Sequence, residues 1–151
     1  MDITQIPFNK FIEISSSSAD DCALELAFND HMQNHLGTFH ASAQFALAEA
    51  CSGLALQRHF LHLANSVVPV LRKSELKFKR PAQSTILAKA HLDAKTKEEF
   101  ELQLEKKGRA TITVPVEITD QQGNITLVGT YEWYVQNNMS VGESPRTTQP
   151  K

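Results

Sequence analysis

Several features that would point to whole classes of protein are scarce or missing in this sequence. Its 151 residues include only two cysteines, Cys22 and Cys51, and both stand among apolar neighbours. We interpret them as free buried thiols in a reducing compartment rather than as a disulfide. No apolar run approaches the length of about 18 residues that suits a membrane-spanning helix. Residues 1–8 lack the basic and apolar regions of a signal peptide, so the cytoplasm is the expected location.

An excess of charge of one sign is also missing. The chain has 15 Lys and Arg against 17 Asp and Glu, a formal net charge of −2. This balance argues against a dominant role on nucleic acid or at a membrane surface. With 41% hydrophobic and 21% charged residues, the chain is suited to one globular domain with a substantial core. We assign residues 1–136 to this domain. Residues 137–151 are polar and without periodicity, and we expect a disordered tail there.

One acidic residue stands out for its surroundings. Glu49 is the only Asp or Glu between His31 and Ser74, and it lies within a run of small and apolar residues, 41–56. That composition predicts a buried helix over about 40–59, with Thr38 as its N-cap. A carboxylate in such a helix loses several kcal/mol of hydration unless something compensates it. Glu49 is therefore either paired for structure or used in chemistry.

Strand patterns flank this helix on both sides. Alternation of apolar and polar residues predicts strands over 8–15, 22–28, 66–79, 85–93, 110–118 and 125–135. In the long strand 66–79 we expect one face to carry Val68, Val70, Ser74, Leu76 and Phe78. Residues 97–107 fit either a strand or a short helix. We favour the helix because Thr96 and Glu99 form a capping-box pattern and Gly108 would end it.

This order of elements predicts an α+β fold. Antiparallel strands need cover for their apolar face, and a curved antiparallel sheet wrapped around one long central helix provides it. A half-wrapped helix still leaves apolar surface at its rim. Pairing of two copies would cover that surface, so we expect a homodimer or a homotetramer.

Helix geometry constrains where a site involving Glu49 can form. Glu49 follows His40 by nine residues, a rise of roughly 13–14 Å, and it ends on the opposite side of the helix. The start of the helix and Glu49 of one chain therefore cannot share a site, whereas two antiparallel helices of a dimer can bring them together. Backbone N–H groups at a helix start can stabilise an oxyanion. A carboxylate opposite them can act as a general base or a nucleophile.

The motif Asn34-x-x-Gly37-x-x-His40, followed by Glu49, resembles the hotdog-fold acyl-CoA thioesterases. The resemblance is strongest to the phenylacetyl-CoA and 4-hydroxybenzoyl-CoA types and their uncharacterised relatives. Those families carry an Asn or Gln, then His-Gly-Gly, then an Asp or Glu nine residues after the His. The order of elements fits from about residue 8 to residue 135. The resemblance implies a hotdog fold.

It also implies roles for particular residues. Glu49 would be the catalytic carboxylate, and the Ala41 amide would polarise the thioester carbonyl. Asn34 would position the carbonyl or the water, His40 would shape the start of the helix, and Gly37 would lie against the substrate. No metal or redox cofactor is required, and coenzyme A enters only as part of the substrate. Lys79 and Arg80 are candidates for binding its phosphates, although their basic stretch could simply be a solvated strand face.

The chain departs from the family pattern at two places. His-Gly-Gly becomes His40-Ala41-Ser42, which keeps the backbone amide but adds two side chains near it. Some relatives carry a Thr four residues after the carboxylate to hold the water, and Gly53 occupies that place here. Ser52 is the adjacent hydroxyl that could substitute for it.

Structural interpretations stand beside these functional ones. Glu49 could pair with a histidine or with Arg58, although Arg58 is nine positions away and cannot reach it within one helix. Asn34 could be a turn residue only, and His40 a capping histidine. The remaining histidines match no compact zinc pattern, and Cys51 lies too deep in an apolar helix to be a good nucleophile.

The function expected from the sequence is hydrolysis of an acyl-CoA or acyl-carrier thioester to free acid and thiol. One alternative is a non-catalytic hotdog domain that binds acyl ligands or serves in assembly. A less favoured alternative is an acyl-thioester dehydratase, whose usual residue patterns are missing from this sequence.

Overall fold

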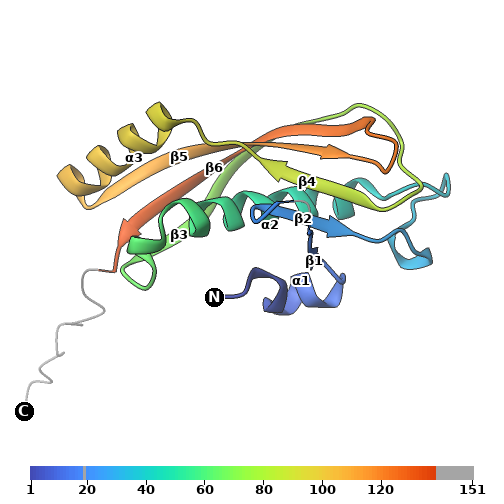
Figure 1. Ribbon diagram of the computed structural model, residues 1–151, viewed down its shortest axis with the longest axis horizontal. Coiled ribbons are helices and arrows are strands. Elements are labelled where there is room, and N and C mark those ends of the chain that lie inside the picture. Colours follow the sequence, from blue (N-terminus) through green and yellow to red (C-terminus); the bar gives the residue numbers. More distant parts are fainter. Residues whose placement is uncertain (19, 139–151) are drawn as a thin grey trace, which may run out of the picture.

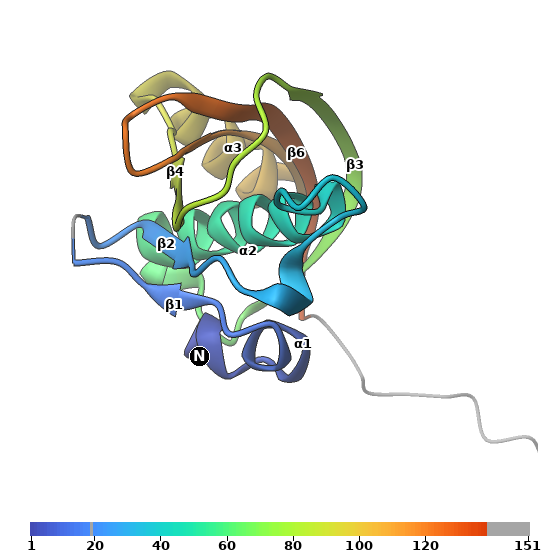
Figure 2. The same ribbon diagram turned by 90° about the vertical axis from the view of Figure 1, so that its right-hand side faces the viewer.

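A long helix, α2 (Ala41–His59), runs along the hollow side of a curved antiparallel sheet (Figures 1 and 2). The computed structural model describes residues 1–18 and 20–138. The strand order in the six-stranded sheet is β1-β2-β4-β5-β6-β3. Its strands are β1 (Ser15–Ser16), β2 (Ala23–Leu26), β4 (Ile86–Ala90), β5 (Arg109–Thr119), β6 (Ile125–Asn137) and β3 (Val67–Phe78). The predicted α+β architecture is confirmed.

Shorter helices complete the described chain. They are α1 (Pro7–Phe11), α3 (Ala94–Lys107) and the 3₁₀ turns η1 (Ile3–Gln5), η2 (Asp30–Met32) and η3 (Leu61–Leu63). Figure 2 places α1 on the side of α2 opposite β5 and β6, near β1. The amino-terminal segment therefore closes part of the helix surface that the sheet leaves open.

The core forms where α2 meets β2, β4, β5 and β6. Leu47, Ala48 and Cys51 of α2 are fully buried there. The strict alternation in β5 places Ile112 and Val114 against the helix and leaves the intervening residues on the outer face. This alternation is why one helix can be enclosed while the convex side of the sheet stays polar.

The strand predicted over 8–15 is wrong for most of its length. Residues 7–11 form the short helix α1, and only Ser15 of the predicted span joins a strand, β1. Pro7 explains the difference, because it stands at the first helical position, where its missing N–H would have had no partner.

The start of α2 also differs from the prediction. The N-cap is His40 rather than Thr38, because the His40 backbone is extended (φ −63°, ψ 140°) and its Nδ1 accepts a hydrogen bond from Ser42 N at 3.0 Å. Thr38 instead receives a hydrogen bond from Asn34. An imidazole nitrogen thus accepts the capping hydrogen bond that a Ser, Thr, Asp or Asn oxygen usually accepts at a helix start.

The helix α3 confirms our preference for a helix over 97–107, although it begins earlier. Asp93 is its N-cap and accepts a hydrogen bond from Thr96 N at 2.7 Å. Gly108 ends it with φ 68°, a left-handed conformation that favours glycine.

The predicted face of β3 is wrong at its first half. The pairing with β6 shifts between Leu71 and Lys73, which marks an irregularity of the β-bulge type. Such an extra residue reverses the alternation. Ser74 therefore pairs with inward-facing Tyr131, whereas Val70 pairs with Tyr134 on the outer side. Val68 and Val70 are accordingly exposed, at 45% and 55%.

The last strand extends slightly past residue 136, where we placed the end of the domain. β6 continues to Asn137, and the Asn138 side chain donates a hydrogen bond to the Asn65 carbonyl. The rest of the predicted tail, 139–151, lies outside the described residues. None of the described helices combines the length and apolar character needed to cross a membrane.

Candidate functional site

Glu49 lies on the least covered stripe of α2. Phe45, Glu49 and Gly53 follow one another at a turn's spacing and are only half-buried, whereas most other residues of the helix between 43 and 56 are buried. The carboxylate is therefore at a boundary, partly withdrawn from water and still accessible from one side. A group that must receive a substrate needs such a position.

The Glu49 carboxylate has no structural partner. Within residues 1–18 and 20–138 it makes no hydrogen bond or ion pair, and burial alone raises its pKa. Arg58 is exposed near the far end of the helix. The structural ion pair that the sequence left open therefore has no counterpart in the described part of the chain.

Helix geometry gives the direction in which Glu49 points. Cys51 lies on the β2 side of α2, where its thiol donates to the Cys22 carbonyl at 3.4 Å, and Ser52 lies on the β6 side, bonded to Trp133. Each helical residue turns by ~100°, so Ser52 is ~100° around from Cys51 and Glu49 is ~60° further in the same sense. The sheet continues in that sense from β6 to β3 (Figure 2). Glu49 therefore faces the β3 edge of the sheet.

The start of α2 presents one unused backbone donor. Ser42 N donates to His40 Nδ1, and the amides of Ala43 and Gln44 donate to the His40 carbonyl at 3.0 and 3.2 Å. The Ala41 N–H has no acceptor within the described residues, and Ala41 is exposed. A free amide at the positive end of a helix is suited to an anionic or polarised oxygen.

Asn34 builds the loop that leads to this helix start. Its Oδ1 accepts hydrogen bonds from Leu36 N (2.9 Å) and Thr38 N (3.2 Å), and its Nδ2 donates to Thr38 Oγ1 at 2.9 Å. Gly37 takes the left-handed φ of 69° that this turn requires. The geometry thus matches the turn-residue interpretation of Asn34, since its side chain is engaged within its own loop.

The segment after β3 lies beside the same loop. Phe39 N donates to the Ala82 carbonyl at 2.8 Å, and Gln83 Nε2 donates to the Gly37 carbonyl at 3.1 Å. Lys79 and Arg80 immediately precede this contact and are exposed. The two candidate phosphate-binding residues are therefore at the same end of the molecule as the free Ala41 amide.

Ser52 is not placed to hold a water. It is fully buried, its Oγ donates to the Glu49 carbonyl at 2.7 Å, and it accepts from Trp133 Nε1 at 2.9 Å. A β-carbon at Gly53 would lie 3.5 Å from the Trp133 ring, in ordinary van der Waals contact. Sequence reasoning missed the role of Trp133 here, because its contact with Ser52 spans 81 residues of sequence. The only local signal was the pair of aromatic residues two apart in β6.

The described residues offer neither a metal site nor a reactive cysteine. No group of three or more His, Cys, Asp or Glu in 1–18 and 20–138 is placed to hold a metal ion. Both cysteines are free, and burial raises the pKa of the Cys51 thiol to about 12. A thiol with that pKa is almost entirely protonated at neutral pH, so Cys51 is unsuited to nucleophilic attack.

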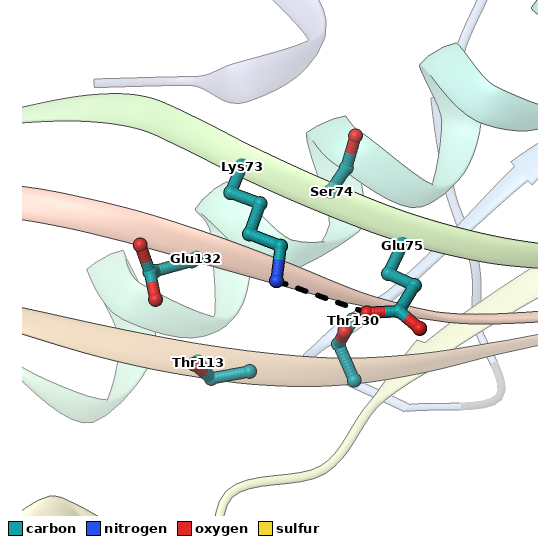
Figure 3. A pocket seen from close by; sticks show the side chains of 6 residues that line it. All are labelled: Lys73, Ser74, Glu75, Thr113, Thr130 and Glu132. Carbon is teal, nitrogen blue, oxygen red and sulfur yellow. Dashed lines mark ion pairs between the residues drawn. The ribbon is translucent and has the colours of Figure 1, made fainter.

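A small hollow lies on the outer face of the sheet (Figure 3). It is lined by Lys73, Ser74, Glu75, Thr113, Thr130 and Glu132. Lys73 Nζ lies 3.8 Å from Glu75 Oε2, and both side chains are exposed. The hollow measures about 70 Å³, far below the ~300 Å³ at which ligand pockets begin. This part of the basic stretch is a solvated strand face, on the side of the sheet opposite α2 (Figure 3).

The family described as "Domain of unknown function (DUF4442)" matches residues 7–135, most of the chain. The chain belongs to the DUF4442 family. No curated protein matches it.

Solved structures similar to this DUF4442 chain share its fold. PA5026 from Pseudomonas aeruginosa, described as a probable thioesterase, has a TM-score of 0.78 and 23% identity, over 90% of this chain and 91% of that one. BH2602 from Bacillus halodurans, solved with CoA, has a TM-score of 0.64 and 18% identity over 85% and 74%. The thioesterase SAV0944 from Staphylococcus aureus has a TM-score of 0.62 and 16% identity over 85% and 98%. The predicted hotdog fold is therefore confirmed for this DUF4442 chain.

Proposed function

We propose that this DUF4442 protein hydrolyses an acyl thioester of coenzyme A, or of an acyl carrier, to a free acid and a thiol. The observation that carries this proposal is the half-buried Glu49 carboxylate, which has a raised pKa and no partner in the described chain. A carboxylate kept in that state is costly to the fold, and its retention favours a chemical role.

The site requires a second copy of the chain. Within one α2, the Ala41 amide and Glu49 are eight residues apart, a rise of ~12 Å, which is too far for both to contact one thioester carbonyl and its attacking water. Two antiparallel copies of α2 would bring the Ala41 amide of one chain beside the Glu49 of the other. Each dimer would then hold two equivalent sites.

The edge strand β3 offers the surface for this dimer. It is the last strand of the sheet, is 12 residues long, and carries the exposed apolar residues Val68, Val70 and Phe78. Long open edges readily pair with another strand. Antiparallel pairing of two β3 edges implies a two-fold axis perpendicular to the sheet, which places both α2 helices on one face and antiparallel. Glu49 faces this edge, as the proposed site requires.

In the proposed reaction the thioester carbonyl oxygen accepts a hydrogen bond from the Ala41 amide of one chain. Glu49 of the other chain removes a proton from a water as that water attacks the carbonyl carbon. Collapse of the tetrahedral intermediate breaks the C–S bond, and the proton held by Glu49 passes to the leaving thiolate. Direct attack by the Glu49 carboxylate, through an anhydride that water then hydrolyses, uses the same geometry.

Two features of the similar structures support this proposal. BH2602 was solved with CoA, and in this chain Lys79 and Arg80 lie beside the loop that leads to Ala41, where they could meet coenzyme A phosphates. SAV0944 has been crystallised with a glutamate and with a glutamine replaced by alanine, two positions fifteen residues apart in that chain. Glu49 and Asn34 are also fifteen residues apart here.

The test is thiol release from a panel of straight-chain, branched and aryl acyl-CoAs. We expect turnover of at least one member, and a loss of at least ~100-fold in kcat for Glu49→Ala with the oligomer intact. Asn34→Ala is assayed in the same way. The matched control is Glu99→Gln, which neutralises an exposed carboxylate on α3. Equal rates for the wild type and Glu49→Ala would reject the mechanism. Binding of every acyl-CoA without turnover would favour the non-catalytic acyl-binding alternative.

A further inference from the structure

Two residues of β6 hold the turn of α2 that carries Glu49. The Tyr131 hydroxyl donates to the Phe45 carbonyl at 3.2 Å, one turn before Glu49. The Trp133 ring N–H donates to Ser52 Oγ at 2.9 Å, and Ser52 in turn donates to the Glu49 carbonyl at 2.7 Å. We call Tyr131, Trp133 and Ser52 the β6 clamp.

The clamp acts directly on the backbone of Glu49. In an α-helix the Phe45 carbonyl accepts the hydrogen bond of the Glu49 N–H. The Tyr131 hydroxyl donates to that same carbonyl oxygen. The Ser52 hydroxyl bonds the Glu49 carbonyl from the other side. Both peptide groups that flank the Glu49 α-carbon are therefore tied to β6.

The residues of the clamp are buried, and the strand register of β6 determines which way Tyr131 and Trp133 point. Tyr131 and Ser52 are fully buried, and Trp133 is 9% exposed. Tyr131 and Trp133 are two residues apart in β6, so both point to the helix side, opposite Val114 and Ile112 of β5. Hydrogen bonds enclosed in this way resist competition from water and fix the groups that they join.

We propose that Tyr131 and Trp133 are positioning residues that hold the Glu49 turn of α2 at a fixed distance from the sheet, so that the carboxylate is presented toward the β3 edge. This inference rests on the proposed thioesterase function for its kinetic consequences only. Its structural consequences can be measured on the protein without any substrate.

Glu49 also affects the electrostatics of the clamp. The negative charge of Glu49 is one cause, after burial, of a raised pKa at Tyr131, which shows that the two side chains are near neighbours. The Tyr131 hydroxyl nevertheless donates its hydrogen bond to the Phe45 carbonyl and not to the Glu49 carboxylate. Glu49 is thereby kept close to the sheet and still unbonded.

The experiment compares Tyr131→Phe and Ser52→Ala with Tyr134→Phe. The control removes the same hydroxyl from the outer face of the same strand, where Tyr134 pairs with Val70. We expect Tyr131→Phe and Ser52→Ala to lower kcat by ~10-fold with KM within about twofold, because small displacements of a reacting group cost rate rather than binding. Freed from the clamp, the turn admits water, so the acid limb of the pH–rate profile should move to lower pH. Tyr134→Phe should behave like the wild type.

Two measurements without substrate separate this proposal from the proposed function. Amide hydrogen exchange at Glu49 should accelerate by ~10-fold in Tyr131→Phe, and the carbon-13 titration of the Glu49 carboxyl should shift to lower pH. A wild type that turns over no thioester would end the proposed function but leave these readouts decisive for the clamp. Unchanged exchange and an unchanged Glu49 titration in both Tyr131→Phe and Ser52→Ala would overturn the clamp.

Discussion

The free Ala41 amide and the Glu49 carboxylate belong to one helix, yet eight residues and ~12 Å of helix separate them. In the proposed acyl transfer the Ala41 amide donates a hydrogen bond to the oxyanion, and Glu49 is the base that activates water. Glu49 faces the open β3 edge, and in the proposed dimer a second copy of the chain supplies the missing partner.

Replacement of Glu49 by a neutral isostere should stabilise the fold at neutral pH. Burial raises the pKa of Glu49 above its ordinary value of 4.5, so the folded chain retains the proton at pH values where the unfolded chain has lost it. The Glu49 contribution to stability therefore falls as pH rises through that window. Glu49→Gln should have a higher Tm than the wild type above the raised pKa, and the difference should vanish well below pH 4.5, where both states hold the proton. Thermal denaturation across pH checks this, and a lower Tm for the variant at pH 7 would reveal a stabilising partner.

Much of the fold was predictable because its patterns are local. The apolar run around Glu49 predicted a central helix. The strict alternation in 110–118 predicted a strand with one buried and one solvent-exposed face. The errors came where one residue changes the pattern. Pro7 starts a five-residue helix that occupies the first part of the segment 8–15, which we predicted as a strand. The irregularity between Leu71 and Lys73 reverses the faces of β3.

The candidate site was only partly predictable for a different reason. The isolation of Glu49 is visible in the sequence, since no other acidic residue is near it. The β6 clamp is not, because the Trp133–Ser52 bond joins residues 81 positions apart and depends on how β6 curves over α2. The resemblance pointed to the Ala41 amide, but its lack of an acceptor depends on the fold, in which His40 accepts hydrogen bonds from the amides of Ser42, Ala43 and Gln44.

Asn34→Ala should weaken the fold as well as the activity. The variant loses the acceptor for Leu36 N and Thr38 N and the donor to Thr38 Oγ1, so we expect a loss of about 1–3 kcal/mol in the free energy of unfolding. Asn34→Asp keeps the acceptor oxygen and should retain most of the stability. Urea denaturation of both variants tests this. Wild-type stability in Asn34→Ala would show that the turn does not depend on this side chain.

Disruption of the β3 edge should abolish activity without unfolding the chain. Val70 is 55% exposed on β3, and a charge there disfavours pairing of two edges. We expect Val70→Asp to sediment as a monomer, with the circular dichroism of the wild type and a loss of at least ~100-fold in kcat. Leu102→Asp, at an equally exposed position on α3, should remain a dimer with normal activity. A fully active monomer would mean that one chain contains the whole site.

Subunit complementation tests the central claim most directly. Ala41→Pro removes only the unused N–H, because proline suits the first position of a helix and His40 already has the extended backbone that must precede it. Homodimers of Ala41→Pro and of Glu49→Gln should each be inactive. After the two are mixed, unfolded and refolded together, half of the dimers are mixed, and each mixed dimer has one intact site. We predict recovery of ~25% of wild-type activity, as random pairing of a two-fold dimer requires. Refolded mixtures that stay as inactive as their parents would contradict a site shared between two chains.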